Sequence, residues 1–344
     1  MIDNQIKIPK VSIFMITYNH EKYIAKALDS ILMQEVDFDY EIVVGEDYSK
    51  DNTREILLSY KSKYPDKFKL LLHDKNIGMM PNVSATLRAC TGKYIALLEG
   101  DDYWTDLHKL QIQIDAMEEH PNCHMSFHPV SLLKNDKIGK KLCQHSDENK
   151  IFTTSEVILG GGGFCSTPSL VLKQEVISNL PEFFHQKAPV GDYFLQILGS
   201  VSGGALYIDR TMAIARTGHE GSWTVRTHRS KISKSIEERN KIFKKQEKDL
   251  SNYIEALDDL NIYLDQKYTN EISHAKAGIL FGLGVLYLKY KYYNEYKNAI
   301  EKSYKTYKLK SINFVILYNF RHFPKTIYFI RKIGTQFLQF LGRI

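Results

Sequence analysis

The stretch that decides the fold is YIALLEGDDYW, residues 94–104. Its apolar first half predicts a buried strand, and that strand ends abruptly in polar residues. Three carboxylates then crowd into four positions, those of Glu99, Asp101 and Asp102. Like charges this close repel one another, and each carboxylate is costly to bury without a partner. The stretch therefore predicts a strand whose end binds positive charge.

The first 130 residues alternate between short apolar runs and segments with helical spacing. The apolar runs predict strands over residues 11–16, 40–44, 68–72, 94–98 and 124–127. The segments between them predict helices over residues 23–33, 52–64, 82–90 and 106–119. Because strands that alternate with helices form parallel β-α-β units, we predict an α/β fold with a doubly wound, mostly parallel sheet. Further strands are predicted over residues 170–172 and 205–208.

Polar residues follow the first four predicted strands at their carboxyl ends, which is where parallel sheets bind ligands. They lie in residues 17–20, 46–47, 73–78 and 99–102. A single polar strand end is ordinary, because loops are polar and Asp often caps a helix. Four polar strand ends at one edge predict a binding site.

Spacing excludes several chemistries that use acidic clusters. The first strand is followed by Thr17 and Tyr18, where an aspartyl phosphatase carries its nucleophile. Neither the G-x-G-x-x-G of a Rossmann oxidoreductase nor a P-loop is present. The carboxylates after Leu98 lack the alternating positions of a calcium loop. What remains is a divalent ion, Mg²⁺ or Mn²⁺, held by one or two carboxylates together with substrate phosphates.

Four short stretches carry a resemblance to a known family: VSIFMITYNH (11–20), EIVVGEDYSKDNT (41–53), NIGMMPN (76–82) and LLEGDDYW (97–104). In this order and spacing they resemble the nucleotide-sugar-binding half of inverting family 2 glycosyltransferases, which have the GT-A fold. The resemblance continues more weakly through VGDYFL and RTGHEGSW to about residue 225. The acidic motif of the family usually opens with Asp, where this chain has Glu99.

The resemblance implies a donor pocket made by the strand ends. It implies that Thr17, Tyr18 and Asn19 line the nucleotide pocket, and that Asp47 accepts from the base with Glu46 beside it. Asn76 and Gly78 are expected over the ribose and the diphosphate. The remaining donor contacts implied are those of Glu99, Gly100, Asp101 and Asp102, with Asp101 on the metal ion and Asp102 pointing at the donor sugar.

The resemblance also implies catalytic residues beyond the first 130. It places the general base at Asp192, a diphosphate or metal contact at His219, and sugar-pocket contacts at Trp223 and Trp104. Structural interpretations stay open: Asp192 can cap a helix, His219 can be a hydrogen-bonding loop residue, and Trp223 can pack in the core. A base must be separate from the metal ligands, and Asp192 lies 91 positions after Asp101.

The chain changes character at about residue 230, where a long amphipathic helix is followed by a predicted helical hairpin over residues 275–290 and 292–307. We therefore predict two parts. Residues 1–229 form the GT-A domain that the resemblance implies, with donor binding in residues 1–130 and the acceptor side in residues 131–229. Residues 230–344 form an all-helical C-terminal region.

The basic character of the chain belongs to its end. Residues 302–344 hold nine Lys or Arg and no acidic residue, whereas the other 301 residues carry 37 basic against 40 acidic side chains. This distribution argues against a nucleic-acid-binding protein. Residues 314–341 interleave cations with aromatic and aliphatic residues, which is typical of an interfacial helix on an anionic membrane. The alternative is an ordinary terminal helix docked on the hairpin.

Together these features predict a metal-dependent inverting glycosyltransferase that moves a sugar from a nucleoside diphosphate donor to a glycan or lipid-linked saccharide. The family resemblance favours a role in bacterial capsule or O-antigen synthesis. Four widely spaced cysteines favour a reducing compartment, and we expect the protein in the cytoplasm or at the inner face of the membrane. The alternatives are a nucleotidyltransferase, although its Gly-rich basic motif is missing after the first strand, and a non-catalytic nucleotide-binding scaffold.

Overall fold

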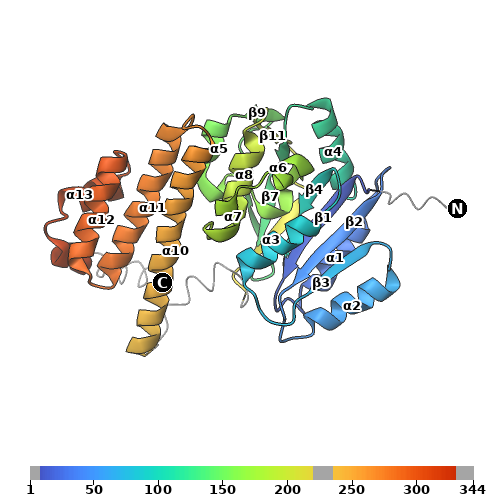
Figure 1. Ribbon diagram of the computed structural model, residues 1–344, viewed down its shortest axis with the longest axis horizontal. Coiled ribbons are helices and arrows are strands. Elements are labelled where there is room, and N and C mark those ends of the chain that lie inside the picture. The colour runs from blue at the N-terminus through green and yellow to red at the C-terminus, as the bar shows by residue number, and fades with distance from the viewer. Residues whose placement is uncertain (1–7, 220–234, 331–344) are drawn as a thin grey trace. The chain divides into compact units, whose positions relative to one another are not determined.

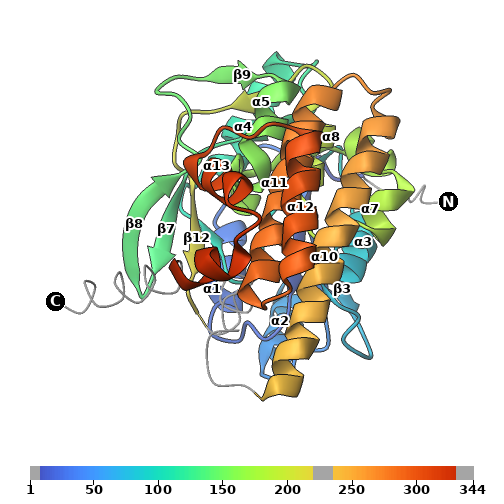
Figure 2. The same ribbon diagram turned by 90° about the vertical axis from the view of Figure 1, so that its left-hand side faces the viewer.

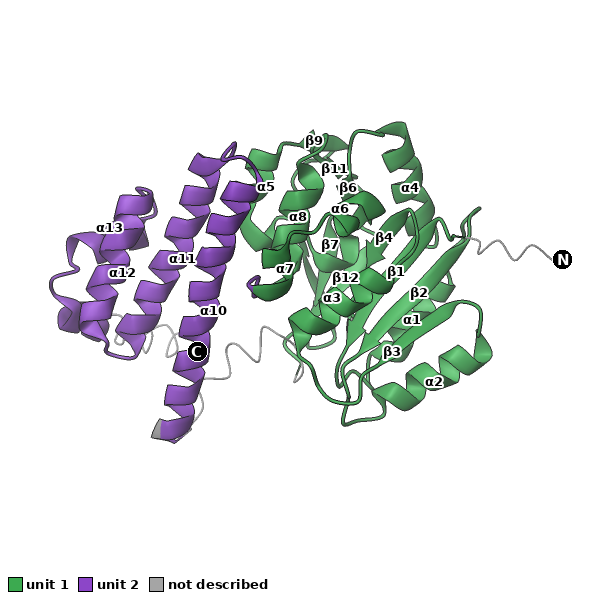
Figure 3. Ribbon diagram, in the orientation of Figure 1, with its two compact units in different colours: residues 1–186, 190–231 green, residues 187–189, 232–344 purple. Residues whose placement is uncertain are grey.

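The computed structural model describes residues 8–219 and 235–330. The chain divides into two compact units (Figure 3). The first consists of residues 1–186 and 190–231, and the second of residues 187–189 and 232–344.

The first unit is built on an eight-stranded sheet with the order β3-β2-β1-β4-β10-β6-β11-β9 (Figure 1). Its strands are β1 (Val11–Thr17), β2 (Tyr40–Glu46), β3 (Phe68–Leu72), β4 (Tyr94–Leu97), β6 (Met125–Phe127), β9 (Lys150–Phe152), β10 (Val171–Lys173) and β11 (Ala205–Tyr207). Strands β1 to β4 are parallel, whereas β10 runs antiparallel to both β4 and β6. The seven strands predicted from apolar runs are confirmed, and β9 was not predicted.

Helices cover both faces of this sheet. They are α1 (Ile24–Leu32), α2 (Thr53–Lys63), α3 (Met79–Ala89), α4 (Lys109–Glu119), α5 (Thr154–Gly160), α6 (Gln174–Ser178), α7 (Glu182–Gln186) and α8 (Asp192–Ser200). Helix α3 approaches β2 closely, because Gly45 leaves room that a Cβ atom would fill at 2.2 Å from the Asn82 side chain. The Asn82 amide then donates to the Gly45 carbonyl at 2.9 Å.

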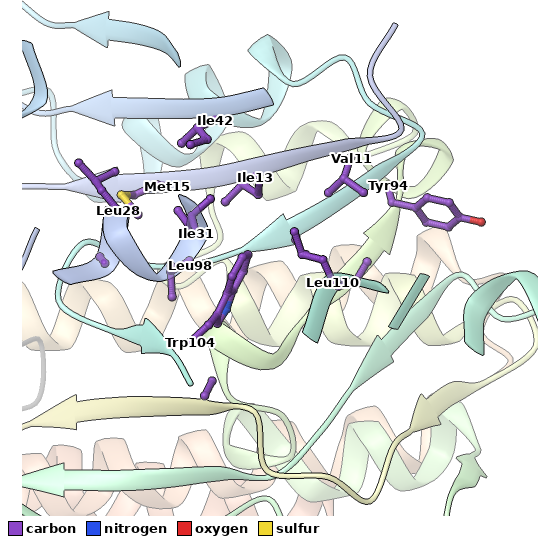
Figure 4. Packing of buried hydrophobic residues seen from close by; sticks show 14 of the residues in the cluster. Val11, Ile13, Met15, Leu28, Ile31, Ile42, Tyr94, Leu98, Trp104 and Leu110 are labelled. Carbon is purple, nitrogen blue, oxygen red and sulfur yellow. The ribbon is translucent and has the colours of Figure 1, made fainter. Parts of the chain in front are cut away.

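The core lies between one face of β1, β2 and β4 and the helices α1, α2 and α4. Val11, Ile13 and Met15 alternate along β1 and point into this core, as a period of two requires (Figure 4). Leu28 of α1 and Leu110 of α4 meet them there. This packing fixes the parallel strands, and so it fixes where their carboxyl ends lie.

A second, four-stranded sheet has the order β5-β12-β7-β8 and was not predicted. Its strands are β5 (Tyr103–Trp104), β7 (Val130–Lys134), β8 (Lys137–Leu142) and β12 (Ala213–Thr217), and β12, β7 and β8 lie side by side in Figure 2. These strands could not be recognised from the sequence, because β5 has only two residues and β8 is exposed along nearly its whole length. Between β7 and β8, Asn135 and Asp136 both have positive φ, which suits a two-residue hairpin turn.

The second unit is helical, as predicted. It includes α10 (Ile236–Tyr263), α11 (Thr269–Lys289), α12 (Tyr293–Thr306) and α13 (Ile312–Asn319), and α11 with α12 confirms the predicted hairpin. Gly284 lets these two helices meet closely, since a Cβ there would lie 2.7 Å from Ile300 Cδ1. Within the described ranges, no helix is both long and apolar enough to cross a bilayer.

Candidate functional site

The carboxyl ends of β1, β2 and β4 are tied together by backbone hydrogen bonds. The Asp47 N–H donates to the Thr17 carbonyl at 3.1 Å, and the Gly100 N–H donates to the Ile16 carbonyl at 3.1 Å. Gly100 must be small, because a Cβ there would lie 2.7 Å from Thr17 Oγ1. The three predicted strand ends therefore form one continuous polar edge.

Asp47 organises the loop that follows β3. Its Oδ1 accepts from the Ile77 N–H at 2.7 Å, and its Oδ2 accepts from the Gly78 N–H at 3.0 Å and the Asn76 side chain at 2.9 Å. Gly78 has a φ of +92°, a conformation that favours glycine, and it starts α3. A carboxylate has about four acceptor positions, and the Ile77, Gly78 and Asn76 bonds use three of them. Asp47 can therefore position this loop and still accept from one further donor.

Glu46 is fully buried and neutralised by a neighbour. Its Oε2 pairs with the guanidinium of Arg54, which also donates to the His73 carbonyl at 2.5 Å. Its Oε1 accepts from the Ser49 N–H at 2.6 Å. These partners make Glu46 a brace between the ends of β2 and β3. Glu46 directly precedes Asp47 in the sequence, so the two residues are neighbours as predicted. The bonds of Glu46 to Arg54 and Ser49 stabilise the fold.

Asn19 joins the end of β1 to the loop after β2. It has a φ of +56°, and its N–H donates to Ser49 Oγ at 2.9 Å. Its side-chain oxygen accepts from the Lys50 N–H at 2.7 Å. Tyr18 stands next to it and is half-buried. The predicted nucleotide-pocket residues thus lie on one strand end that is held against its neighbour.

Asp101 is paired with a histidine from far along the chain. His219 Nε2 donates to Asp101 Oδ2 at 2.7 Å, and both side chains are largely buried. Burial would raise the pKa of Asp101, but the hydrogen bond from His219 and the charges of His20 and His219 outweigh it. The pKa of Asp101 is therefore held below its ordinary value, and the group is a carboxylate at neutral pH.

Asp102 has the opposite electrostatic environment. Its Oδ1 accepts from the Arg216 N–H at 2.7 Å on β12. Burial and the negative charges of Asp101 and Glu99 raise the pKa of Asp102 well above its ordinary value, although Arg216 opposes the shift. The Arg216 guanidinium lies 4.5 Å from the ring centre of Tyr23 and donates to the Asp101 carbonyl at 3.0 Å. Asp102 is therefore a carboxyl whose charged form is disfavoured, and Arg216 offsets only part of that effect.

The carboxylate oxygens of the acidic loop are the kind of ligand that a divalent ion such as Mg²⁺ takes. Across residues 8–219 and 235–330, no three His, Cys, Asp or Glu side chains gather as an all-protein metal site. Mg²⁺ and Mn²⁺ are commonly bound by one or two carboxylates plus substrate phosphates. Asp101 has the required ionised oxygen, and a hydrogen-bonding partner such as His219 is what orients a ligating carboxylate.

Asp192 lies at the start of α8, on a different element from the acidic loop. Its Oδ1 accepts from the Tyr193 N–H at 2.8 Å. Burial raises its pKa, and the backbone hydrogen bonds offset only part of that effect. The preceding Gly191 lies beside α3, because a Cβ atom added at Gly191 would be 3.5 Å from Val83 and 3.8 Å from Met80. Asp192 therefore directly follows a residue that packs beside α3, the helix that starts after Gly78.

Comparisons with known proteins identify the group to which this site belongs. The family model described as glycosyl transferase family 2 matches residues 12–179. Residues 12–179 form a glycosyl transferase family 2 domain. This match contains the first three strand ends, the loop after β3 and the whole acidic loop.

Relatives of the family 2 chain come from several bacteria. An uncharacterized protein of Mycobacterium tuberculosis is 34% identical over 214 residues, which are 62% of this chain and 60% of the relative. The glucosyltransferase WfgD of Escherichia coli is 31% identical over 131 residues, 38% of this chain and 49% of WfgD. The matched part thus spans about three fifths of the length of the mycobacterial relative.

Solved structures confirm the fold class of the family 2 chain. TarS of Staphylococcus aureus, solved with UDP-GlcNAc, aligns with a TM-score of 0.58 at 18% identity and covers 92% of this chain and 87% of its own. The mannosyltransferase PcManGT of Pyrobaculum calidifontis, solved with GDP-Man and Mn²⁺, aligns with a TM-score of 0.52 at 13% identity and covers 92% and 85%. The protein has the predicted GT-A type α/β fold followed by a helical C-terminal region.

Two tryptophans, Trp223 and Trp104, were predicted to contact the donor sugar. Trp223 lies outside the described residues. Trp104, expected at the sugar pocket, is in the core instead: it is 1% exposed, and its indole N–H donates to the Pro168 carbonyl at 2.9 Å. The prediction that Trp104 contacts the sugar was wrong. An aromatic residue next to an acidic motif can also pack in the hydrophobic core, and Trp104 does so.

Sequence reasoning gave no role in the site to His20 or Arg216, and it did not predict that Lys109 is buried in the core. His20 lies 3.2 Å from Thr17 Oγ1 and lowers the pKa of Asp101 by its charge, and Arg216 braces the acidic loop. Lys109 is fully buried with its ammonium 4.0 Å from the ring centre of Trp104. A lysine in the first turn of a predicted helix is expected to be exposed, so the sequence did not indicate that Lys109 is buried. The burial follows from its packing against Trp104.

Proposed function

We propose that this protein is an inverting glycosyltransferase that moves a sugar from a nucleoside diphosphate sugar to a hydroxyl of a glycan or lipid-linked saccharide. The observation that carries the proposal is the acidic loop after β4, where Asp101 pairs with His219 at 2.7 Å, together with a second largely buried carboxylate, Asp192, at the start of α8. The pKa of Asp101 is lowered, and an ionised carboxylate suits a metal cation that in turn binds the diphosphate. The pKa of Asp192 is raised, and such a carboxylate suits proton removal.

Residues 1–130 bind the donor in this proposal, and residues 131–229 form the acceptor side. Thr17, Tyr18, Asn19 and Asp47 surround the nucleotide, with Glu46 as a brace. The loop of Asn76 and Gly78 covers the ribose and diphosphate, and its position is supported by the bonds to Asp47. Glu99, Gly100, Asp102 and Trp223 complete the donor contacts.

Asp101 would hold a Mn²⁺ or Mg²⁺ ion, with His219 beside it. When bound, the ion neutralises the charge that develops on the departing diphosphate. The structure of PcManGT with GDP-Man and Mn²⁺ supports a divalent ion in a protein of similar fold. His219 keeps the Asp101 carboxylate in place for this role, at a distance of 2.7 Å.

Asp192 acts as the general base. It takes the proton from an acceptor hydroxyl as that oxygen attacks the anomeric carbon of the donor sugar. The bond between this carbon and the diphosphate oxygen breaks, and the nucleoside diphosphate leaves with the electron pair. Attack from the face opposite the leaving group inverts the configuration at the anomeric carbon. Each atom and charge is then accounted for without a further reactant.

The acceptor is proposed to belong to bacterial surface polysaccharide synthesis, for example of capsule or O-antigen. WfgD supports this, since its name describes transfer from UDP-Glc to alpha-D-GlcNAc-diphosphoundecaprenol. A lipid-linked acceptor of this kind would place the enzyme in the cytoplasm at the inner face of the membrane, with peripheral contact to anionic lipid.

Donor turnover tests the proposal. The purified protein is incubated with UDP-, GDP-, CDP- and dTDP-sugars in the presence of Mn²⁺, and the released nucleotide is identified by chromatography. We expect one donor to release a nucleoside diphosphate, and Asp101→Asn and Asp192→Asn each to slow that release by at least about 10²-fold. Release of inorganic pyrophosphate from a sugar phosphate and a nucleoside triphosphate would instead indicate a nucleotidyltransferase. Nucleotide binding without turnover of any donor would indicate a scaffold.

A further inference from the structure

An apolar face is exposed on helix α13 and the residues after it. Five side chains form what we call the docking face: Ile312, Val315, Ile316, Phe320 and Phe323. Their exposed fractions are 75%, 43%, 47%, 54% and 62% in chain order. Ile312, Ile316 and Phe320 follow one another at intervals of four, which places them on one side of the helix.

The opposite side of α13 is already buried in the helical unit. Phe314 is 1% exposed and Leu317 is 3% exposed, and the Leu317 carbonyl accepts from the Tyr296 hydroxyl at 2.9 Å. Tyr318 stacks on Tyr304 of α12 with ring centres 3.9 Å apart. The docking face is therefore held by a packed core, and the second apolar side of the helix has no cover of its own within the described residues.

The concentration of exposed apolar residues here is unusual for the protein. Among the described residues, 18 large apolar side chains are exposed, and seven of them lie within residues 312–330. The two beyond the docking face, Phe329 and Ile330, are 62% and 63% exposed. Scattered exposed apolar residues are normal, whereas a contiguous group marks an interaction surface.

The charge around the docking face favours one kind of partner. Residues 302–330 contain six Lys or Arg and no acidic residue. Lys308, Lys310 and Lys325 are exposed, and Arg321 is half-buried against Tyr318 and paired with Glu301. A second copy of this chain would bring the same cations against one another. An anionic bilayer accepts apolar side chains below its headgroups and cations at their level, which suits both features.

We propose that the docking face binds the surface of an anionic lipid bilayer. Ile316, Phe320 and Phe323 enter the boundary between headgroups and acyl chains, and Lys310 and Lys325 contact lipid phosphates. This inference rests on the proposed function for its purpose, because a lipid-linked acceptor lies in the membrane, but the surface itself is defined by α13 and the residues directly after it. It also refines the two sequence-based interpretations, since α13 is docked on its neighbours by one side and exposed by the other.

Vesicle sedimentation with the full chain tests the docking face. Wild type is mixed with vesicles of 70% phosphatidylcholine and 30% phosphatidylglycerol, or of phosphatidylcholine alone. We expect binding to the anionic vesicles and at least tenfold weaker binding of the double variant Ile316→Asp, Phe323→Asp. Ile262→Asp is the matched control, because Ile262 is 68% exposed on α10 of the same unit. Lys310→Gln should weaken binding roughly fivefold, the value of one cation near an anionic surface.

Two results would overturn the inference. One is absence of vesicle binding by wild type, and the other is an equal loss in Ile262→Asp and in the double variant. Circular dichroism checks that each variant is folded, and light scattering after gel filtration detects the case in which a second copy covers the face. Release of nucleoside diphosphate in detergent-free solution should be unchanged in the double variant. Turnover by wild type without vesicle binding would mean that only this inference fails. Vesicle binding by wild type without turnover of any donor would mean that only the proposed function fails.

Discussion

The end of β4 and the start of α8 each present a largely buried aspartate, and the two are treated in opposite ways. At the end of β4, burial would raise the pKa of Asp101, but the hydrogen bond from His219 and electrostatic interactions with His20 and His219 lower it. At the start of α8, Asp192 receives backbone hydrogen bonds but no charged partner among the causes of its shift, and burial raises its pKa. The same side chain is thus kept charged in one place and made basic in the other.

This difference teaches how one fold separates two tasks. A carboxylate that already has a low pKa is a poor proton acceptor but a good partner for a cation. A carboxylate of raised pKa binds a proton more readily, which is what a general base requires. The two elements are far apart in sequence, so each environment is set by its own neighbours. The contrast between Asp101 and Asp192 can be broken or sharpened by substitution.

The largest expected effect is that of Asp192→Asn. Removing the proposed base should lower transfer by roughly 10²- to 10⁴-fold, the usual contribution of general base catalysis. Nucleotide binding should remain, because Asp192 is separate from the donor edge. Initial rates at saturating donor and acceptor measure the effect. A variant with near wild-type rates would remove Asp192 from the mechanism.

The pH profile of wild type is the control for this assignment. Asp192 must be ionised to accept a proton, so the rate should fall as the pH drops through its folded-state pKa. Because that pKa is raised, the fall should begin above the ordinary range of an aspartate, about 3.9. The residual activity of Asp192→Asn should lack this acidic limb.

Asp101→Asn should come next in size. Losing the charge that holds the ion and diphosphate should lower turnover by about 10²- to 10³-fold, as for loss of one transition-state stabiliser. Chelation of metal in wild type should reproduce most of the loss. Titration with Mn²⁺ during the assay measures both, and addition of a chelator should then change Asp101→Asn little. A variant that still responds fully to Mn²⁺ would place the metal elsewhere.

His219→Gln should have a smaller effect on the same site. Gln can still donate a hydrogen bond but carries no positive charge, and loss of an orienting partner typically costs 10- to 100-fold in metal affinity or activity. The activity curve against Mn²⁺ concentration should shift to higher Mn²⁺, with the maximal rate reduced less. A fall in the maximal rate with no shift would mean that His219 acts on the sugar or diphosphate instead.

The smallest effect expected is on stability, at Lys109. Burial lowers the pKa of Lys109 well below its ordinary value, so its ammonium form is disfavoured in the fold, and the nearby Trp104 ring offsets only part of this. Lys109→Met keeps the volume and removes the charge. It should raise the free energy of unfolding at pH 7 by about 1 kcal/mol or more, because at that pH the fold must either bury a poorly compensated ammonium or release its proton, and both cost free energy.

The sign with pH follows from the lowered pKa. The unfolded chain binds the Lys109 proton more tightly than the fold does, so the penalty is complete below the folded-state pKa. It disappears as the pH rises towards the unfolded value of about 10.4. Urea unfolding at pH 7 and pH 10 should show the gain of Lys109→Met shrinking at the higher pH. A constant gain at both values would mean that packing, not charge, sets it.

The sequence was sufficient for the parallel half of the sheet. Runs such as Val11–Ile16 are buried on both faces, so their apolar character is continuous, and the polar residues after them mark the strand ends. It was insufficient for the second sheet, where β8 is exposed and β5 has two residues. Short strands of this kind are defined by their partners and leave no pattern of their own.

The site itself divides in the same way. Asp47 and Asp101 were placed correctly at their strand ends, because a strand end can be read from the chain. The bond from His219 to Asp101 joins residues 118 positions apart, and spacing alone contains no sign of it. Neither does the sequence show that Arg54 neutralises Glu46, or that Trp104 covers Lys109. These contacts arise only when the two sheets and the helices pack.

The most direct test of the central claim is nucleotide binding to three proteins: wild type, Asp101→Asn and Asp192→Asn. Thermal unfolding is measured with UDP, GDP, CDP and dTDP, with and without Mn²⁺, since a ligand that binds the native state raises the melting temperature. We predict that one nucleotide stabilises wild type and Asp192→Asn in a Mn²⁺-dependent manner, and that Asp101→Asn loses the Mn²⁺ dependence. Stabilisation by no nucleotide, or an unchanged Mn²⁺ response in Asp101→Asn, would contradict the account.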